Sequence, residues 1–243
     1  MSRRHYGTLV GQSALISLIG FIAAGPFSYI ICKWLYPQPR WISGDIYAKK
    51  YNAIQHLPYY TGFVMLIGFL MLFAVHYLNS KEMKSKVRIG TLVAFALAGI
   101  YAMIMMCIYI IQISFVRNLA LEYSPMDETV FALFNLHNPK SITWYFQIWS
   151  NAILGVATWF MAGYYRNSNG ILRQLLMVNG ILSILTAACT VFDKHLLFTE
   201  IGTTAYILWN ALIVVILIMI YQQSQRPSVA PNGEAKRSAD VAA

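Results

Sequence analysis

The chain has 243 residues, of which 58% are hydrophobic and 11% charged, and its mean hydropathy is +0.55. A soluble domain carries about 25% charged residues, so this composition excludes an ordinary soluble domain and is typical of a membrane protein. The net charge of +9 is scattered through the loops between apolar stretches, which favours membrane topology over nucleic acid as its explanation. We therefore expect the lipid bilayer as a partner and no nucleic acid.

Six apolar stretches are each long enough to cross the ~30 Å hydrocarbon layer, which takes about 20 helical residues. They cover residues 8–35, 57–78, 87–116, 142–165, 171–192 and 201–221. Gly25-Pro26 should kink the first, Pro58 suits the start of the second, and the third must tilt or project because of its length. The sequence predicts an all-α, polytopic bundle of six transmembrane helices over residues 1–225, with a disordered cytoplasmic tail over 226–243.

The first stretch has a second interpretation, a cleaved signal peptide. Arg3 and Arg4 would be its basic start and Ala23-Ala24-Gly25 its cleavage site. Pro26 follows at once, however, and the apolar character continues beyond it. These observations favour a membrane span.

Basic residues fall mostly on alternate sides of the spans, which predicts the orientation. If the N-terminus is cytoplasmic, 11 bases lie inside and 7 outside, and the inside ones occupy short loops and tails, where positive charge has most influence on topology. Both termini are therefore predicted to lie in the cytoplasm, with the protein in the cytoplasmic or plasma membrane.

The two long outer loops carry helix signals of their own. Ser43-Gly44-Asp45 opens one segment, and Ser124-Pro125-Met126-Asp127 opens another by combining an N-cap, a proline and an acid. Ser141 can cap the fourth span. Apolar positions recur at near-helical spacing in both segments, so we expect short interfacial helices, of which residues 125–136 either lie in the interface or fold back as a lid.

Uncharged polar side chains are the most informative candidates for a site. Gln147 and Asn151 lie four residues apart on one face of the fourth span, and Gln112 should lie at similar depth on the third. Such amides either bond between helices or line a polar cavity that opens outward, because an unpaired amide in hydrocarbon is costly. In the second case the predicted ligand-binding residues are Gln112, Gln147, Asn151, Trp144, Glu122 and His137, the last two at the mouth.

The predicted function is binding or transport of a small or amphipathic molecule through that pocket. No charged residue lies in the middle of a span, which argues against a proton-coupled pump. One alternative is a membrane enzyme acting on a lipid-like or isoprenoid substrate at the outer leaflet, and another is a non-catalytic partner subunit. The enzyme's acid–base groups would come from Glu122, Asp193, His56 and His195.

Motifs for cofactors and metals are missing from the sequence. There is no P-loop and no HxxxH or HExxH spacing, and the three cysteines form no CxxC pair. We expect no cofactor and no metal site, and the sequence does not indicate an oligomeric state.

Overall fold

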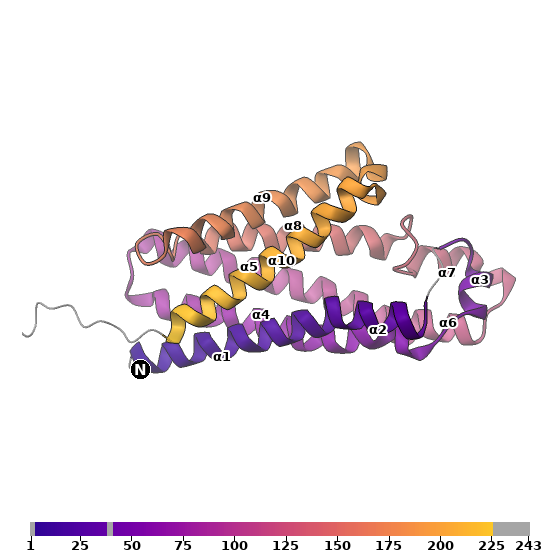
Figure 1. The fold of residues 1–243 in the computed structure, drawn as a ribbon, viewed down its shortest axis with the longest axis horizontal. Coiled ribbons are helices and arrows are strands. Elements are labelled where there is room, and N and C mark those ends of the chain that lie inside the picture. The colour runs from indigo at the N-terminus through magenta and orange to yellow at the C-terminus, as the bar shows by residue number, and fades with distance from the viewer. Residues whose placement is uncertain (1–2, 38–40, 226–243) are drawn as a thin grey trace, which may run out of the picture.

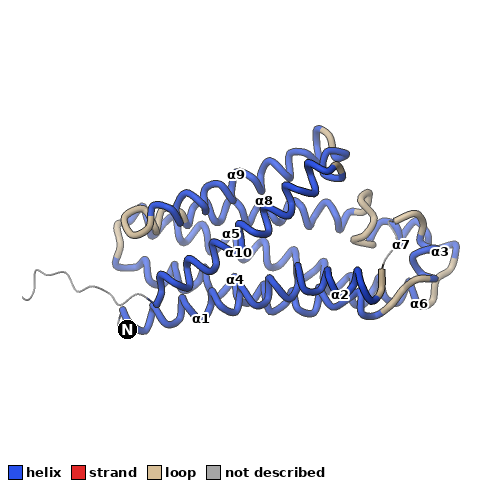
Figure 2. The backbone as a smooth tube through the Cα atoms, in the orientation of Figure 1, coloured by secondary structure: helices blue, strands red, loops and turns tan. Residues whose placement is uncertain are grey.

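The computed structural model describes residues 3–37 and 41–225 of the chain. Within those ranges the chain is helical and contains no strand (Figure 2). The α-helices there are α1 Arg3–Ile22, α2 Ser28–Leu35, α3 Gly44–Lys49, α4 Leu57–Asn79, α5 Ser85–Ile110, α6 Arg117–Leu121, α7 Glu128–Phe134, α8 Ile142–Met161, α9 Gly170–Phe192 and α10 Glu200–Gln225. The predicted tail over residues 226–243 lies outside the described residues.

Six long helices form a ring in the order α1, α4, α5, α8, α9 and α10, and α10 returns to α1 (Figure 1). Gly7 and Gly11 of α1 lie against Ser224 of α10, so both ends of the described chain meet at one end of the ring. We call this the terminal end. The opposite end, which carries α3, α6 and α7, is the cap end. Which end faces the cytoplasm stays a prediction.

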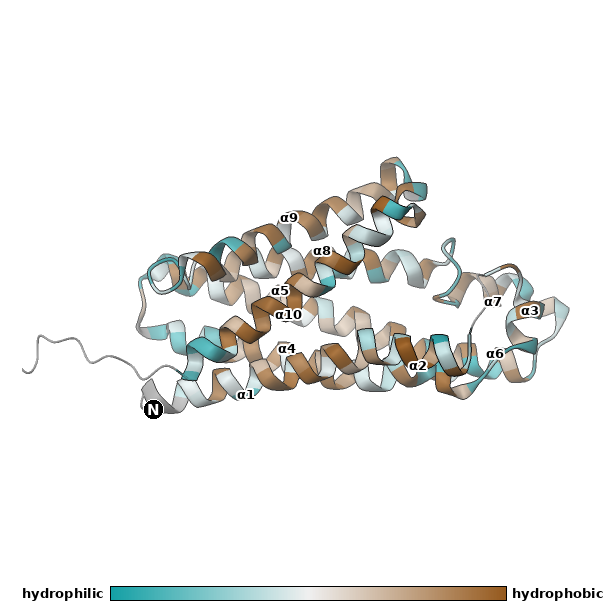
Figure 3. Cartoon of the chain, viewed as in Figure 1, coloured by the Kyte–Doolittle hydropathy of each residue, from teal (hydrophilic) through white to brown (hydrophobic). Residues whose placement is uncertain are grey.

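Five helical segments of the described chain are long and apolar enough to cross a membrane: Tyr6–Leu35, Ala53–Asn79, Ser85–Leu121, Gly170–Phe192 and Glu200–Gln225. They fit a multi-pass membrane protein and agree with five of the six predicted spans. Brown, apolar residues dominate the length of the helices in Figure 3, and teal residues gather near their ends.

The predicted fourth span is the exception. Its helix, α8, begins at Ile142 behind the predicted Ser141 cap, whose hydroxyl accepts a 3.1 Å hydrogen bond from the Trp144 backbone N–H. The helix ends at Met161, and residues 162–169 turn toward α9 instead of extending the span to residue 165. Several aromatic and amide side chains interrupt the apolar residues of α8, which is not among the five segments suited to crossing a membrane, so length and composition do not confirm a count of six.

Two of the long segments contain a π-helical turn, of which only the first, at Gly25-Pro26, coincides with a predicted irregularity. In the first span the turn covers Ala23–Phe27, around Pro26, and the Ser28 hydroxyl donates to the Ala23 carbonyl at 2.5 Å. Proline cannot donate a backbone hydrogen bond, which explains why the helix is disturbed at this point. The second turn, Ile111–Val116, joins α5 to α6 and makes a continuous segment of 37 residues. At about 1.5 Å per residue this segment is longer than the hydrocarbon layer is thick, and that it tilts or projects stays a prediction.

The terminal half of the ring is tightly packed. Of the twelve largest fully buried side chains in the described residues, eight lie there: Leu72, Phe73, His76, Met161, Leu172, Leu176, Leu217 and Ile220. The His76 Nδ1–H donates to the Leu72 carbonyl at 2.7 Å, because a carbonyl can only accept, and Nε2 therefore accepts from the Tyr165 hydroxyl. A cavity of about 20 Å³ among these side chains is the size of a single water molecule.

The cap end has a small aromatic core of its own. Phe131 of α7 is fully buried, with its ring 5.5 Å from that of Tyr47 on α3 and 5.9 Å from that of Trp41. The predicted loop helices are thus present but shorter than expected: α3 has six residues, and α7 ends at Phe134 rather than at residue 136. The two helices pack on each other and on the end of the third span, which forms a cap over the ring.

Candidate functional site

The interior face of α8 changes character along its length. Leu154, Thr158 and Met161 face the small cavity in the terminal half, and their spacing of three or four residues defines the side of α8 that faces the ring interior. The same spacing continued toward the cap end reaches Asn151, Gln147 and Trp144. The predicted site residues on α8 therefore extend an interior face that is mainly apolar at the terminal end and polar at the cap end.

The amides of Gln147 and Asn151 are the unsatisfied part of this face. Both side chains are half-buried. In the described part of the chain, neither carboxamide has a hydrogen-bond partner, although Asn179 on α9 donates to the Thr158 hydroxyl at 2.9 Å. The two amides of α8 are thus free to bond to water or to a ligand, whereas Asn179 has the interhelical role that is usual for membrane amides.

Gln112 has a different role from the one predicted for a pocket-lining residue. Its Nε2 donates to the Phe134 carbonyl at 2.8 Å, and its Oε1 accepts from the Leu136 backbone N–H at 3.1 Å. The Thr143 hydroxyl of α8 donates to the same Phe134 carbonyl at 2.9 Å. Side chains from the π-helical turn after α5 and from α8 thereby hold the end of α7, which joins these two segments at the cap end.

Tyrosines on α5 and α10 face the same interior region. Tyr101 and Tyr109 on α5 are 3% and 6% exposed, and their hydroxyls form no hydrogen bond within the described residues. Tyr206 of α10 is within electrostatic reach of both and stacks on Trp209, with the ring centroids 6.1 Å apart. Hydroxyl and indole groups therefore surround the cap half of the ring interior from two sides.

The burial of α10 differs sharply between its two halves. Its buried residues, Ile213, Ile216, Leu217 and Ile220, all lie toward the terminal end, whereas none of residues 200–212 is buried. Figure 1 shows the cause, because the turn between α9 and α10 rises away from the cap. Side chains therefore close the ring at its terminal end, and the α9–α10 side is less closely packed at the cap end, where the Trp209 indole still donates to the Ser183 hydroxyl at 3.1 Å.

Trp144 has a partly structural environment. Its indole stacks on Phe198 with ring centroids 5.6 Å apart, and Phe198 belongs to the turn between α9 and α10. Trp144 therefore ties the start of α8 to the part of the α9–α10 hairpin that leaves the ring. A ligand that enters on this side would meet the exposed edge of this pair.

Glu122 and His137, predicted at the mouth, lie on the cap. Glu122 is exposed at the end of α6 and forms no ion pair in the described chain. The His137 side chain is also exposed, with its ring 5.4 Å from that of Tyr47. No hydrogen bond, ion pair or ring contact joins either residue to Gln147 or Asn151 among the described residues, so the binding site of six residues stays a prediction.

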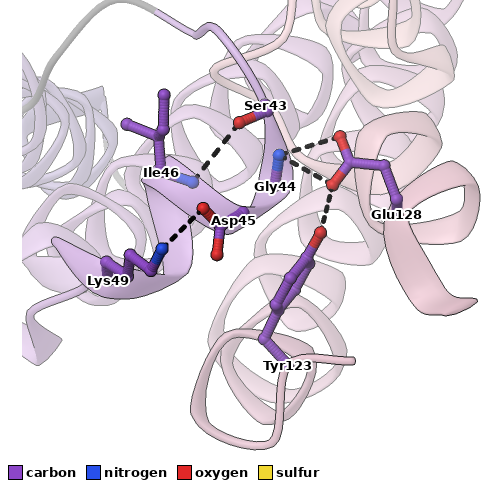
Figure 4. Close-up of polar contacts among 7 residues, drawn as sticks. All are labelled: Ser43, Gly44, Asp45, Ile46, Lys49, Tyr123 and Glu128. Carbon is purple, nitrogen blue, oxygen red and sulfur yellow. Dashed lines mark hydrogen bonds and ion pairs between the residues drawn. The ribbon is translucent and has the colours of Figure 1, made fainter. Parts of the chain in front are cut away.

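The carboxylate that organises the cap is Glu128, which the sequence did not single out. Both of its oxygens accept from the Gly44 backbone N–H at 2.9 Å, and Oε2 also accepts from the Tyr123 hydroxyl at 2.5 Å (Figure 4). A side chain at Gly44 would lie 2.7 Å from Phe131, so only glycine allows this approach. The Glu128 hydrogen bond raises the pKa of Tyr123 to about 12, since it favours the neutral phenol.

The predicted acid–base groups are distributed over separate loops. His56 is buried beneath the cap between the rings of Tyr51 and Tyr59, whereas Asp193 and His195 are exposed in the turn between α9 and α10. Asp193 uses its carboxylate to accept from the His195 backbone N–H at 2.9 Å. Apart from this bond, which leaves the His195 imidazole unused, no hydrogen bond or ion pair joins any two of Glu122, Asp193, His56 and His195 within the described ranges, and no metal-binding group of three or more His, Cys, Asp or Glu residues occurs there.

Sequence reasoning missed the tyrosines of the ring interior. Tyr101 and Tyr109 are eight residues apart, which is about two helical turns. This spacing weakly indicates that the two side chains lie on the same face of the helix. Tyr206 could not be paired with them from the sequence, because nothing local indicates that α10 crosses opposite α5.

Comparisons with known proteins do not assign this chain to a family. The chain matches no protein-family profile, no curated protein and no solved structure at a significant level. The class that the fold defines is a multi-pass, all-α membrane protein, with five helical segments suited to crossing a membrane in the described residues.

Proposed function

We propose that this protein is a six-span membrane protein that binds a neutral amphipathic molecule in the cap half of its helix ring. The sixth span is α8. It connects the cap end, where α5 and α6 finish, to the terminal end, where α9 begins, and its 20 residues reach about 30 Å. Its packing against α5 and α9 shields the polar groups that lower its hydropathy.

The observation that carries the binding proposal is the pair of unsatisfied amides, Gln147 and Asn151, on the interior face of α8. A carboxamide near hydrocarbon needs a hydrogen-bond partner, and the described protein residues provide none for these two. The less closely packed α9–α10 side gives a molecule in the membrane a route to them. A ligand with polar atoms at one end and an apolar body would satisfy the amides and cover the neighbouring aromatic rings.

The neutrality of the ligand follows from the charges of the spans. No Asp, Glu, Lys or Arg occurs in residues 57–79, 89–116, 142–161, 174–192 or 201–225. A charged group within the membrane requires an opposite charge or extensive solvation, and the ring interior offers amides, phenols and indoles. Such a lining suits carbonyl or hydroxyl groups of a lipid-like molecule.

Photocrosslinking with a neutral lipid probe tests this proposal. A diacylglycerol analogue that carries a photoactivatable group on its acyl chain is added to membranes containing the protein, and crosslinked peptides are mapped by mass spectrometry. We expect crosslinks in the segments around residues 101–109, 144–151 and 206–209, and we expect unlabelled diacylglycerol to compete for them.

A matched pair of variants separates binding from general lipid contact. The combined change Gln147→Leu and Asn151→Leu should abolish the competed crosslinks. The control Trp149→Leu alters the opposite side of the same helix, where the side chain is 47% exposed, and should leave them unchanged. Crosslinks that are equal in both variants would show that the probe reports ordinary lipid contact, which would refute the proposal.

A further inference from the structure

A groove of about 410 Å³ opens at the terminal end, where α4 ends and α5 begins. Its lining consists of Tyr77, Met83, Ser85, Arg88, Ile89 and Leu92. Ligand pockets in proteins range from about 300 to 1,000 Å³, so the groove is large enough for part of a lipid. It lies at the opposite end of the ring from the amides of α8 and is independent of the function proposed above.

The wall of the groove divides into two chemical parts. Met83, Ile89 and Leu92 form an apolar part, with exposed fractions of 40%, 61% and 45%. Ser85 and Arg88 form a polar part at the first turn of α5. Leu92 follows Arg88 by four residues, so the apolar part continues from the polar one down the same face of the helix toward the hydrocarbon.

The polar part is strongly basic. Residues 81–88 contain four bases and one acid, and the side chains of Lys81, Lys84, Lys86 and Arg88 are exposed. None of the four forms an ion pair with any acid whose side chain the structure describes, a set that does not include Glu82. The start of α5 adds to the positive field, because no side chain caps it and its first N–H groups point outward.

We propose that this groove binds an anionic phospholipid. The phosphate lies at Arg88 and Ser85, within the field of the neighbouring lysines, and an acyl chain runs along Met83, Ile89 and Leu92. Charge complementarity selects an anionic headgroup, and the apolar wall selects a lipid over a soluble phosphate. Tyr77, at the end of α4, lies beside the headgroup, where interfacial aromatic residues are common.

Native mass spectrometry of the full-length protein tests the proposal. The protein is exposed to an equimolar mixture of phosphatidylglycerol and phosphatidylcholine, and retained lipids are counted. We expect preferential retention of phosphatidylglycerol, and a loss of about fivefold in that preference for each base removed by Lys84→Gln or Arg88→Gln. These side chains are exposed, so the variants should fold normally.

The matched control is the pair Arg166→Gln and Arg173→Gln, which removes the same charge near the same end of the ring without altering the groove. We expect it to keep the lipid preference. An equal loss in both pairs would mean a diffuse attraction to basic loops and would overturn the site.

A second measurement on the unaltered protein tests the lipid assignment. Glycerol 3-phosphate carries the charge without the chains, and we expect it not to displace the bound phosphatidylglycerol. Displacement at concentrations comparable to those of the lipid would identify a phosphate site and would also overturn the proposal.

Discussion

The two halves of the ring are built from the same six helices, but buried side chains of α10 fill one half and none of its residues is buried in the other. In the terminal half, Phe73, Met161 and Ile220 fill the interior, and the His76–Tyr165 pair satisfies its polar groups internally. In the cap half, α10 moves away and Gln147 and Asn151 have no protein partners. A well-packed terminal half and a cap half with unpartnered amides are consistent with the proposed binding of a molecule in the cap half.

The cap shows a further contrast, since two of its polar side chains bond to backbone groups, although the buried Tyr51 Oη, Gln55 Oε1 and Asn135 Nδ2 atoms have no hydrogen-bond partner among the described residues. Glu128 and Gln112 both bond to backbone groups and thereby fix short helices that would be marginal in isolation. Glu128 and Gln112 therefore maintain the structure of the cap, whereas the amides of Gln147 and Asn151 on α8 remain available to water or a ligand. The following predictions test this distinction, from the largest expected effect to the smallest.

Removal of the Glu128 charge should have the largest effect, confined to the cap. Glu128→Gln replaces charge-assisted hydrogen bonds to Gly44 and Tyr123, each worth about 1.5–3 kcal/mol in typical proteins, with weaker ones. We expect faster hydrogen exchange in residues 44–56 and 125–137, with little change in the ring. Glu122→Gln, at an exposed and unpaired carboxylate, is the control, and equal exchange in both variants would contradict the role of Glu128.

A methyl group in the α8–α9 interface should destabilise the ring. A Cβ at position 180 would lie 2.8 Å from the Gly155 carbonyl oxygen, so Gly180→Ala forces the two helices apart at a cost of about 1–3 kcal/mol. Gly99→Ala is the control, because open space surrounds that position and alanine is the better helix former. Thermal unfolding in detergent should show a lower midpoint for the first variant only.

The two kinds of amide should respond differently to removal. Asn179→Leu breaks the hydrogen bond to Thr158 and should cost about 0.6–2 kcal/mol. Asn151→Leu removes an amide without a protein partner and should be neutral or stabilising in ligand-free protein. Equal losses of unfolding free energy would show that Asn151 has a structural partner after all.

The Tyr123 hydroxyl should ionise at a higher pH than an ordinary tyrosine, and its ionisation should destabilise the cap only slightly. Its pKa is raised from 10.0 to about 12 by the bond to Glu128, so the stabilisation is complete below about pH 10 and is lost as the pH rises through about 12. The tyrosinate absorbance of the protein minus that of Tyr123→Phe isolates this group. A difference that titrates near pH 10 would contradict the Tyr123–Glu128 bond.

Much of the fold could be predicted from the sequence, because the signals were local. Apolar length located the spans, Ser141 and Pro58 marked helix starts, and Gly25-Pro26 marked an irregular turn. The helix predicted over residues 125–136 ends two residues earlier in the structure, because Asn135 adopts an extended backbone. Gln112, which is distant in the sequence, forms hydrogen bonds to the residues on either side of Asn135. A non-local hydrogen bond of this kind leaves no local pattern.

The candidate site was harder to predict because it depends on the directions of helices. The spacing of Gln147 and Asn151 placed them on one face, but the sequence could not show that this face points into the ring. It also could not show that Gln112 serves the cap or that Tyr206 lies opposite Tyr101. These relations arise from the order of helices around the ring.

The central proposal is that the cap half of the ring admits water or a ligand at the end that the charges predict to lie outside, and that side chains fill the terminal half. Labelling with a membrane-impermeant maleimide on intact cells tests it most directly, after replacement of Cys32, Cys107 and Cys189 by serine. The thiol of Asn151→Cys should react from outside, as should that of Lys140→Cys in the outer loop, and the thiol of Leu72→Cys should not. Reaction at position 140 without reaction at 151, or reaction at 151 only after permeabilisation, would contradict the account.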